Sequence, residues 1–199
     1  MSQSGARLSG LALYGQMVFH GDLTSRMSDD GVAHCAPPLV EIAAVLSTEI
    51  STLRNLFQFY EYDFSEIEGA RVAEDGRFHH LDNAVFEQAY FIQANGDLAG
   101  FALVNRKASH VVDGEVVWWM EEFFIMRRYR RASLGRQAAH LVIDRHRGTW
   151  EVTQTPNNTA ALAFWRRVLA TYAYEEVEFV DPKWGPRPLQ RFSTTDVKP

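Results

Sequence analysis

The chain has 199 residues, of which 46% are hydrophobic and 23% charged, and its net charge is -5 at pH 7. This length suits one domain with its own core, and no apolar run approaches the roughly 18 residues that a membrane span needs. The negative charge disfavours nucleic acid as a partner, although residues 127–147 carry seven arginines.

A single cysteine, Cys35, excludes an internal disulfide and a zinc site built from several cysteines. This cysteine usage fits a reducing compartment, so we expect a cytoplasmic protein. Residues 1–38 differ from the rest, because their short apolar patch is broken by glycine and lacks a cleavage site. We therefore predict an N-terminal extension over 1–38 and one domain over 39–199.

The domain opens with a predicted strand, "LVEIAAV", followed by a helix. Ile50, Leu53, Phe57 and Tyr60 form one apolar stripe at helical spacing, and Ser47 or Thr48 is the expected cap. Residues 65–88 are polar and lack periodicity, which indicates a loop with room for a short helix.

A β-hairpin is the clearest local pattern in the chain. Asn95-Gly96 is the dipeptide that a type I′ turn prefers, and both flanks are strand-like, so we predict a hairpin over 89–104. Residues 114–126, "GEVVWWMEEFFIM", are rich in aromatic and β-branched residues and predict a long strand that ends at the arginines.

The remaining pattern alternates helices and strands. We predict a helix from Gly135 with a basic last turn "RHR" and a stop at Gly148. A strand over 149–155, a helix over 157–172 capped by Asn158 or Thr159, and strands over 174–180 and 188–194 follow. The expected fold class is α/β (α+β), with a mixed, mostly antiparallel sheet flanked by helices.

The turn between the long strand and its helix is a predicted anion site. Unpaired N–H groups and the positive end of the helix dipole meet there, and Ala132, Ser133 and Gly135 are small enough for a phosphate to approach the backbone. "RRASLG", Arg130 to Gly135, resembles the pyrophosphate loop of the GNAT N-acetyltransferases, with Ser133 where the family has its first glycine. "FFI" before it and "NNTAALAFW" after it also resemble that family, over about residues 39–193.

The resemblance implies the fold of that family and acetyl-CoA as the cofactor. It places the pantetheine arm along the backbone of Phe123, Phe124 and Ile125, in a splay between the fourth and fifth strands. The pyrophosphate would be held by backbone N–H groups of residues Arg131, Ala132, Ser133, Leu134, Gly135 and Arg136, with Arg130 or Arg131 adding a charged contact. Asn158 would bind the pantetheine, and Trp165 stands where many relatives have a tyrosine.

Acetyl transfer to an amine needs a base, a polarised carbonyl and a proton for the leaving thiolate. The candidate bases are Glu122, which we prefer, and Glu121; strand alternation predicts that they point to opposite faces. The oxyanion donor implied by the resemblance is a backbone N–H near Ile125. Because the indole of Trp165 is no practical acid, Tyr172, Tyr129 or solvent is left as the proton donor.

The sequence therefore predicts an acetyl-CoA-dependent N-acetyltransferase acting on a small-molecule or peptide amine. The alternative is a non-catalytic acyl-CoA-binding module of regulatory role, which Ser133 and Trp165 at two motif positions would suit. The spacing of the histidines predicts no metal site. The resemblance also favours a homodimer, whereas the acceptor cannot be identified from the sequence.

Overall fold

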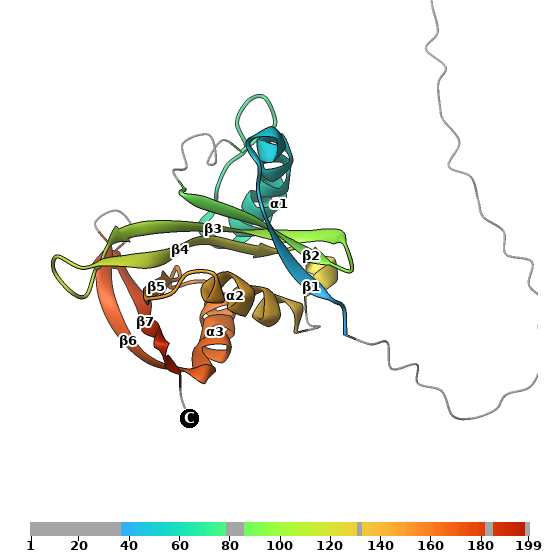
Figure 1. Cartoon of the computed structure of the whole chain (residues 1–199). Helices are drawn as coiled ribbons and strands as arrows, with labels where there is room; N and C mark the ends of the chain where they lie inside the picture. Colours follow the sequence, from blue (N-terminus) through green and yellow to red (C-terminus); the bar gives the residue numbers. More distant parts are fainter. Residues whose placement is uncertain (1–36, 79–85, 131–132, 182–184, 198–199) are drawn as a thin grey trace, which may run out of the picture. The chain divides into compact units, whose positions relative to one another are not determined.

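The computed structural model describes residues 37–78, 86–130, 133–181 and 185–197, so the predicted extension over 1–38 lies almost wholly outside the described residues. Seven strands form one sheet in the order β1-β2-β3-β4-β5-β7-β6 (Figure 1). All neighbours pair antiparallel except β4 and β5, which pair parallel. The predicted fold class, a mixed and mostly antiparallel sheet with helices, is confirmed.

The elements follow the predicted order along the chain. The strands are β1 (Val40–Ala44), β2 (Gln88–Ala94), β3 (Asp97–Ala108), β4 (Val116–Ile125), β5 (Thr149–Thr153), β6 (Tyr172–Asp181) and β7 (Gly185–Val197). The helices are α1 (Ile50–Glu68), α2 (Leu134–Asp144) and α3 (Thr159–Val168), with short 3-10 segments η1 (Ser47–Glu49), η3 (Arg127–Tyr129) and η4 (Leu169–Thr171).

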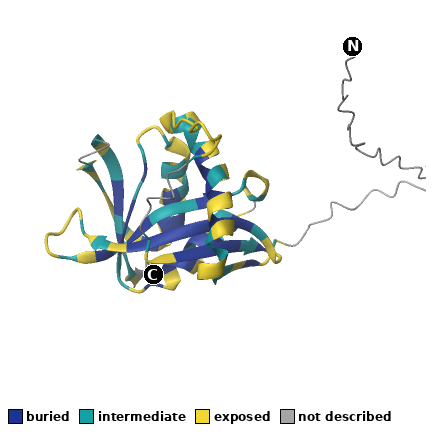
Figure 2. Ribbon diagram, turned by 90° about the horizontal axis from the view of Figure 1, so that it is seen from above, coloured by how far each residue is buried: buried dark blue, intermediate teal, exposed yellow. Residues whose placement is uncertain are grey.

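The helices cover both faces of the sheet, α1 on one and α2 and α3 on the other (Figure 1). Each face has its own cluster of buried side chains. The α1 cluster includes Leu53, Phe57 and Phe101, and the α2 and α3 cluster includes residues such as Val142 and Trp150. The buried residues run along the middle of the sheet (Figure 2).

The β2–β3 hairpin is as predicted. Asn95 and Gly96 form its turn with φ of 52° and 83°, the left-handed values that a type I′ turn requires. The predicted helix α1 is also present, but the predicted cap is wrong. Ser47 lies in η1, and the Glu49 side chain accepts a hydrogen bond from the Leu46 N–H at 2.9 Å.

Helix α1 runs to Glu68, four residues into the stretch expected to be a loop, and ends at Gly69 with a left-handed φ of 69°. The predicted end of α2 is wrong in the opposite direction. The helix ends at Asp144, so the "RHR" segment follows it instead of forming its last turn. His146 of that segment is buried, where it hydrogen-bonds the Tyr90 hydroxyl at 2.9 Å.

A β-bulge interrupts β4 at Glu121. Leu103 pairs with Glu122 and Val104 with Met120, so Glu121 has no residue opposite it in the described ladder. The Glu121 carboxylate contacts Lys107. Lys107 follows Leu103 by four residues along β3, so the two side chains point to the same face, and Leu103 belongs to the α1 cluster. Because Glu122 contacts Tyr60 of α1, both glutamates lie on the α1 face, and the predicted opposite orientation is wrong. The inserted residue reverses the alternation on which that prediction rested.

Candidate active site

The end of β4 has one free edge. The parallel pairing of β4 with β5 is confined to Trp118 with Trp150 and Trp119 with Glu151, after which the two strands have no paired residues in the described sheet. The Met126 N–H donates to the Ala99 carbonyl on the β3 side at 2.9 Å. Since backbone groups alternate along a strand, those of Phe123 and Ile125 point to the free edge.

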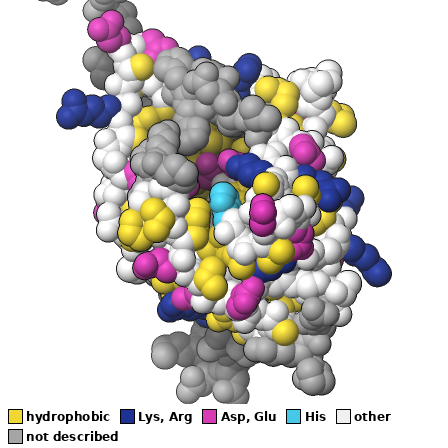
Figure 3. All heavy atoms as spheres, turned by 90° about the vertical axis from the view of Figure 1, so that its left-hand side faces the viewer, with side chains coloured by type: hydrophobic (Ala, Val, Ile, Leu, Met, Phe, Trp, Pro, Cys, Tyr) yellow, Lys and Arg dark blue, Asp and Glu magenta, His cyan; other side chains and the backbone are white. Residues whose placement is uncertain are grey.

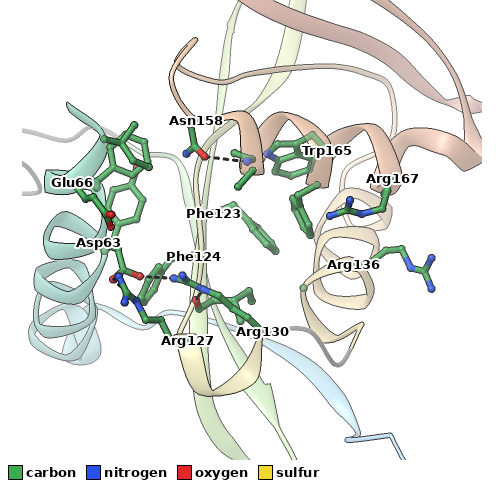
Figure 4. Close-up of a pocket in the computed structure, with 18 of the residues that line it drawn as sticks. Asp63, Glu66, Phe123, Phe124, Arg127, Arg130, Arg136, Asn158, Trp165 and Arg167 are labelled. Atoms are coloured by element: carbon green, nitrogen blue, oxygen red, sulfur yellow. Dashed lines mark hydrogen bonds and ion pairs between the residues drawn. The ribbon is translucent and has the colours of Figure 1, made fainter.

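The turn after β4 is organised around Arg130. Its Nε donates to the Ile125 carbonyl at 2.7 Å, and its Nη2 donates to Asp63 of α1 at 2.5 Å. Arg127 pairs with the same carboxylate through Nε and Nη2, both at 2.9 Å. Asp63 thereby joins α1 to the turn (Figure 4). Its ion pairs bring together two elements that are far apart in the sequence.

The start of α2 has the backbone that the motif requires. Ser133 adopts φ 56° and ψ −3°, a left-handed conformation that glycine takes at little cost, so the backbone at this position is one that suits a glycine. Leu134 points into the core. A Cβ on Gly135 would lie 3.3 Å from the Phe164 ring. Arg131 and Ala132, predicted for the same loop, lie outside the described residues.

A cavity of about 840 Å³ lies between α1, the end of β4, the start of α2 and α3 (Figure 4). Its lining includes the sequence-predicted Phe123, Phe124, Ile125, Arg130, Ser133, Gly135, Arg136, Asn158 and Trp165. It also includes residues that the sequence analysis did not select, namely Tyr60, Phe64, Glu66, Ile67, Arg127, Ala160, Ala161, Phe164 and Arg167, together with Asp63. Arginines therefore surround a cavity whose remaining wall is largely apolar.

Asn158 and Trp165 hold the α3 side of the cavity. Asn158 caps the helix, its Oδ1 accepting from the Ala161 N–H at 3.0 Å, which agrees with one of the two predicted caps. With Oδ1 engaged, the amide NH₂ is the group left to donate to a ligand. Trp165 is buried and packs edge-on against Phe123, with ring centroids 5.5 Å apart.

The two candidate bases have different neighbours. Glu122 accepts a hydrogen bond from the Tyr60 hydroxyl, and Tyr60 lines the cavity while Glu122 does not. Glu121 is hydrogen-bonded to Lys107 and, at 3.3 Å, to the Asn105 amide. Burial, followed by the negative charge of Glu122, raises the pKa of Tyr60 well above its usual range. Tyr60 therefore keeps its proton at neutral pH.

The sequence-predicted proton donors lie outside the cavity. Tyr172 is buried at the start of β6, and its hydroxyl lies 3.4 Å from Nδ1 of His140. Burial and the nearby Asp144 raise its pKa to about 12. Neither Tyr172 nor Tyr129 is among the described residues that line the cavity. Sequence proximity to the motif was the reason for selecting both, and it does not correspond to proximity in space.

A second polar cluster anchors the loop between β3 and β4. The buried Glu151 carboxylate accepts from the Ser109 hydroxyl at 2.5 Å, the His110 N–H at 3.0 Å and Arg191 at 2.8 Å. The His110 ring stacks on Phe179 at 4.7 Å. Figure 3 views the molecule from the side toward which this loop points, and it shows a histidine among hydrophobic, acidic and basic side chains on that face.

The described residues contain no group of three His, Cys, Asp or Glu side chains placed to hold a metal ion. Among the described helices, none is both long and apolar enough to cross a membrane.

Comparison with known proteins identifies relatives of this fold. A family model described as the acetyltransferase (GNAT) family matches residues 50–170. No curated protein matches the sequence. A GNAT-family acetyltransferase from Streptococcus agalactiae has a TM-score of 0.58 at 16% identity, with coverage of 80% of this chain and 96% of that chain.

Two further solved structures are similar. A protein described as histone acetyltransferase HPA2 and related acetyltransferase, from Corynebacterium glutamicum, has a TM-score of 0.56 at 13% identity, covering 82% of this chain and 99% of that chain. Spermidine N-acetyltransferase from Vibrio cholerae, in complex with CoA and spermine, has a TM-score of 0.52 at 10% identity, covering 79% and 96%. At these identities the likeness is one of fold.

Proposed function

The chain belongs to the acetyltransferase (GNAT) family, and from this premise we propose that it transfers an acetyl group from acetyl-CoA to a primary amine. The observation that carries the proposal is the free edge of β4 at Phe123 and Ile125, which leads directly into the arginine-rich turn and the start of α2. A strand edge suits the amide groups of pantetheine, and a helix N-terminus with arginines suits a pyrophosphate.

The residues present fit acetyl-CoA. The cavity combines an apolar wall of Phe123, Phe164 and Trp165 with cationic side chains at Arg130 and Arg136. This combination suits an extended ligand that has amides at one end and phosphates at the other. Arg130 already occupies the Ile125 carbonyl. The arm would therefore pair with the Phe123 backbone, which leaves the Ile125 N–H for the thioester carbonyl.

Bound acetyl-CoA supplies the activated acetyl thioester. Glu122 would accept one proton from the amine nitrogen as that nitrogen forms its bond to the acetyl carbon and the carbon–sulfur bond breaks, with CoA departing as the thiolate. The Ile125 N–H, which points to the free edge, donates to the carbonyl oxygen and stabilises the charge that develops there. We prefer Glu122 to Glu121 because its partner Tyr60 lines the cavity, whereas Glu121 is paired with Lys107.

Calorimetric titration with acetyl-CoA and CoA tests cofactor use, and we expect binding at tens of micromolar or tighter. No binding at that concentration would contradict the proposal. A thiol-release assay over amino acids, polyamines, aminoglycosides and peptide N-termini then tests transfer. Binding without release on any amine would instead support the alternative, a regulatory acyl-CoA-binding module, which the Trp165 indole in place of the motif tyrosine favours.

A matched pair of variants tests the base. Glu122→Gln should lower kcat about 10²-fold or more, as loss of a general base does, whereas Glu121→Gln should change kcat far less. The two residues are adjacent, and each substitution removes one negative charge. Equal losses of kcat in both variants would contradict the assignment to Glu122.

The remaining features of the proposal concern the acceptor and the state of the protein. The acceptor is proposed to be a small-molecule or peptide amine, in keeping with the spermidine N-acetyltransferase that shares the fold. We propose residues 39–199 as the catalytic unit, acting in the cytoplasm as a homodimer. Deletion of residues 1–38 should leave CoA affinity unchanged, and light scattering of the full chain should give twice the 22.7 kDa chain mass.

A further inference from the structure

The hydroxyl of Tyr60 joins the cavity to Glu122. Its Oη donates to the Glu122 carboxylate, and the side chain lines the cavity beside Phe123, Phe124 and Ile125. Glu122 itself is not among the lining residues. Tyr60 therefore connects the proposed base to the cavity.

The reaction needs a proton for the departing thiolate, and few groups are placed to supply it. Among the described lining residues, only Tyr60 and Ser133 carry a hydroxyl. Ser133 belongs to the turn at the start of α2, at the phosphate end of the proposed site. Trp165 of α3 has only an indole N–H, which is no practical acid. Among the described lining side chains, Tyr60 is therefore the candidate by position.

Tyr60 is held rigidly in this position. It lies on the buried stripe of α1, and its ring packs against Phe57 and Phe64 with centroids 5.0 Å apart in each case, and against Phe101 and Phe124 at 5.9 Å. These contacts belong to the ring and not to the hydroxyl. Replacement of the tyrosine by phenylalanine should therefore remove one proton and one hydrogen bond while keeping the packing.

A buried phenol beside a carboxylate gives up its proton only when another proton replaces it. Burial and the charge of Glu122 raise the pKa of Tyr60 well above its usual range. A phenolate left at this position would be a strong base. Once Glu122 carries the amine proton, it becomes both a neutral neighbour and an acid within hydrogen-bond reach.

We propose that Tyr60 and Glu122 form a proton relay in which Tyr60 protonates the leaving sulfur and is itself reprotonated by Glu122. This inference rests on the function proposed above. Glu122 takes one proton from the amine nitrogen as the nitrogen–carbon bond forms and the carbon–sulfur bond breaks. Tyr60 Oη passes its proton to the sulfur and receives the one held by Glu122, so the pair ends in its starting state and the thiol leaves neutral.

The first test compares Tyr60→Phe with Tyr90→Phe, a matched control outside the cavity. Tyr90 is also buried and also hydrogen-bonds one side chain, Nε2 of His146 at 2.9 Å. Calorimetry with CoA should give affinities within about twofold of wild type for both variants, since neither loses a proposed contact to the pantetheine amides or to the phosphates. With an amine identified by the thiol-release panel, Tyr60→Phe should lower kcat on the order of 10²-fold with little change in KM, and Tyr90→Phe should not.

The second test does not depend on turnover. The pKa of the thiol of bound CoA is measured by its ultraviolet thiolate absorbance, with desulfo-CoA as the blank for the protein's own groups. Loss of a hydrogen bond to the thiolate should raise that pKa by about one in Tyr60→Phe and leave it unchanged in Tyr90→Phe. If Tyr60→Phe does not fold, 3-fluorotyrosine at position 60 keeps the shape, and its more acidic hydroxyl should lower the same pKa.

A double variant tests whether the two residues act together. In a relay, Tyr60→Phe combined with Glu122→Gln should be about as slow as the slower single variant, because either substitution already breaks the chain. Multiplied losses would overturn the relay, as would a Tyr60→Phe protein that binds CoA with unchanged kcat and unchanged thiol pKa. Failure of the wild-type protein to bind CoA would instead remove the proposed function on which the relay depends.

Discussion

Replacement of Gly100 by alanine should destabilise the contact between β3 and β4. A Cβ on Gly100 would lie 2.0 Å from the carbonyl oxygen of Phe124 and 3.1 Å from the Cα of Ile125, and both are backbone atoms of the paired strand. Relief requires the strands to separate by more than about 1 Å, because close packing leaves no free space between them. Overpacking of this kind costs up to about 3 kcal/mol.

The net effect follows from two opposing contributions. Alanine has fewer conformations than glycine in the unfolded chain, which offsets about 1 kcal/mol of the overpacking cost. We therefore expect the free energy of unfolding to fall by about 2 kcal/mol. For a protein of this size that corresponds to a Tm lower by about 4–8 °C. Because the displaced residues form the free edge of β4, the affinity for CoA should also fall.

Thermal unfolding followed by circular dichroism, with Gly135→Ala as the control, measures the effect. At Gly135 the added Cβ would meet the Phe164 ring at 3.3 Å, and that side chain can adjust by the small amount required. Alanine also favours the helix by about 1 kcal/mol, so the Tm of this variant should stay the same or rise. A Gly100→Ala protein that melts with the wild type would refute the reasoning.

Three further predictions concern single side chains. Ser133→Gly should raise the Tm by about 1–3 °C, because glycine relieves the left-handed strain at φ 56°. Asp63→Asn should lower the free energy of unfolding by about 1 kcal/mol at low salt, with the deficit shrinking at high salt as exposed ion pairs such as that with Arg130 are screened. Burial lowers the pKa of His146. The neutral imidazole therefore contributes fully to the free energy of unfolding above the unfolded pKa of about 6.5, and this contribution declines as pH falls through the lower folded pKa. In His146→Gln the Tm should depend less on pH between about 7 and 5.

The local patterns of the sequence were sufficient for the order of elements. The Asn95-Gly96 turn and the Asn158 cap both depend on contacts within a few residues, and both occur where predicted. Helix boundaries were less accurate. The start of α1 is set by the hydrogen bond from the Leu46 N–H to the Glu49 side chain, and its end by Gly69. Neighbouring residues could have capped the helix about equally well.

The candidate cofactor residues were predicted by local motifs of β4, the turn and α3, and most of the described ones line one cavity. Tyr60 of the α1 wall was assigned to the apolar stripe of its helix and was not selected as a site residue. Its partner Glu122 is 62 residues away, and nothing near Tyr60 in the sequence identifies that contact. The contact of Asp63 with Arg130 spans 67 residues in the same way.

The sequence by itself determined the order of the strands and helices and the position of the turn between β4 and α2, because turn chemistry, caps and hydrophobic periodicity act over a few residues. Only the tertiary structure decided the orientation of the two glutamates. The bulge at Glu121 arises from how β4 pairs with β3 and is invisible in the sequence of either strand alone. By inserting one residue into a period of two, it turned Glu122 toward α1 and brought it to Tyr60.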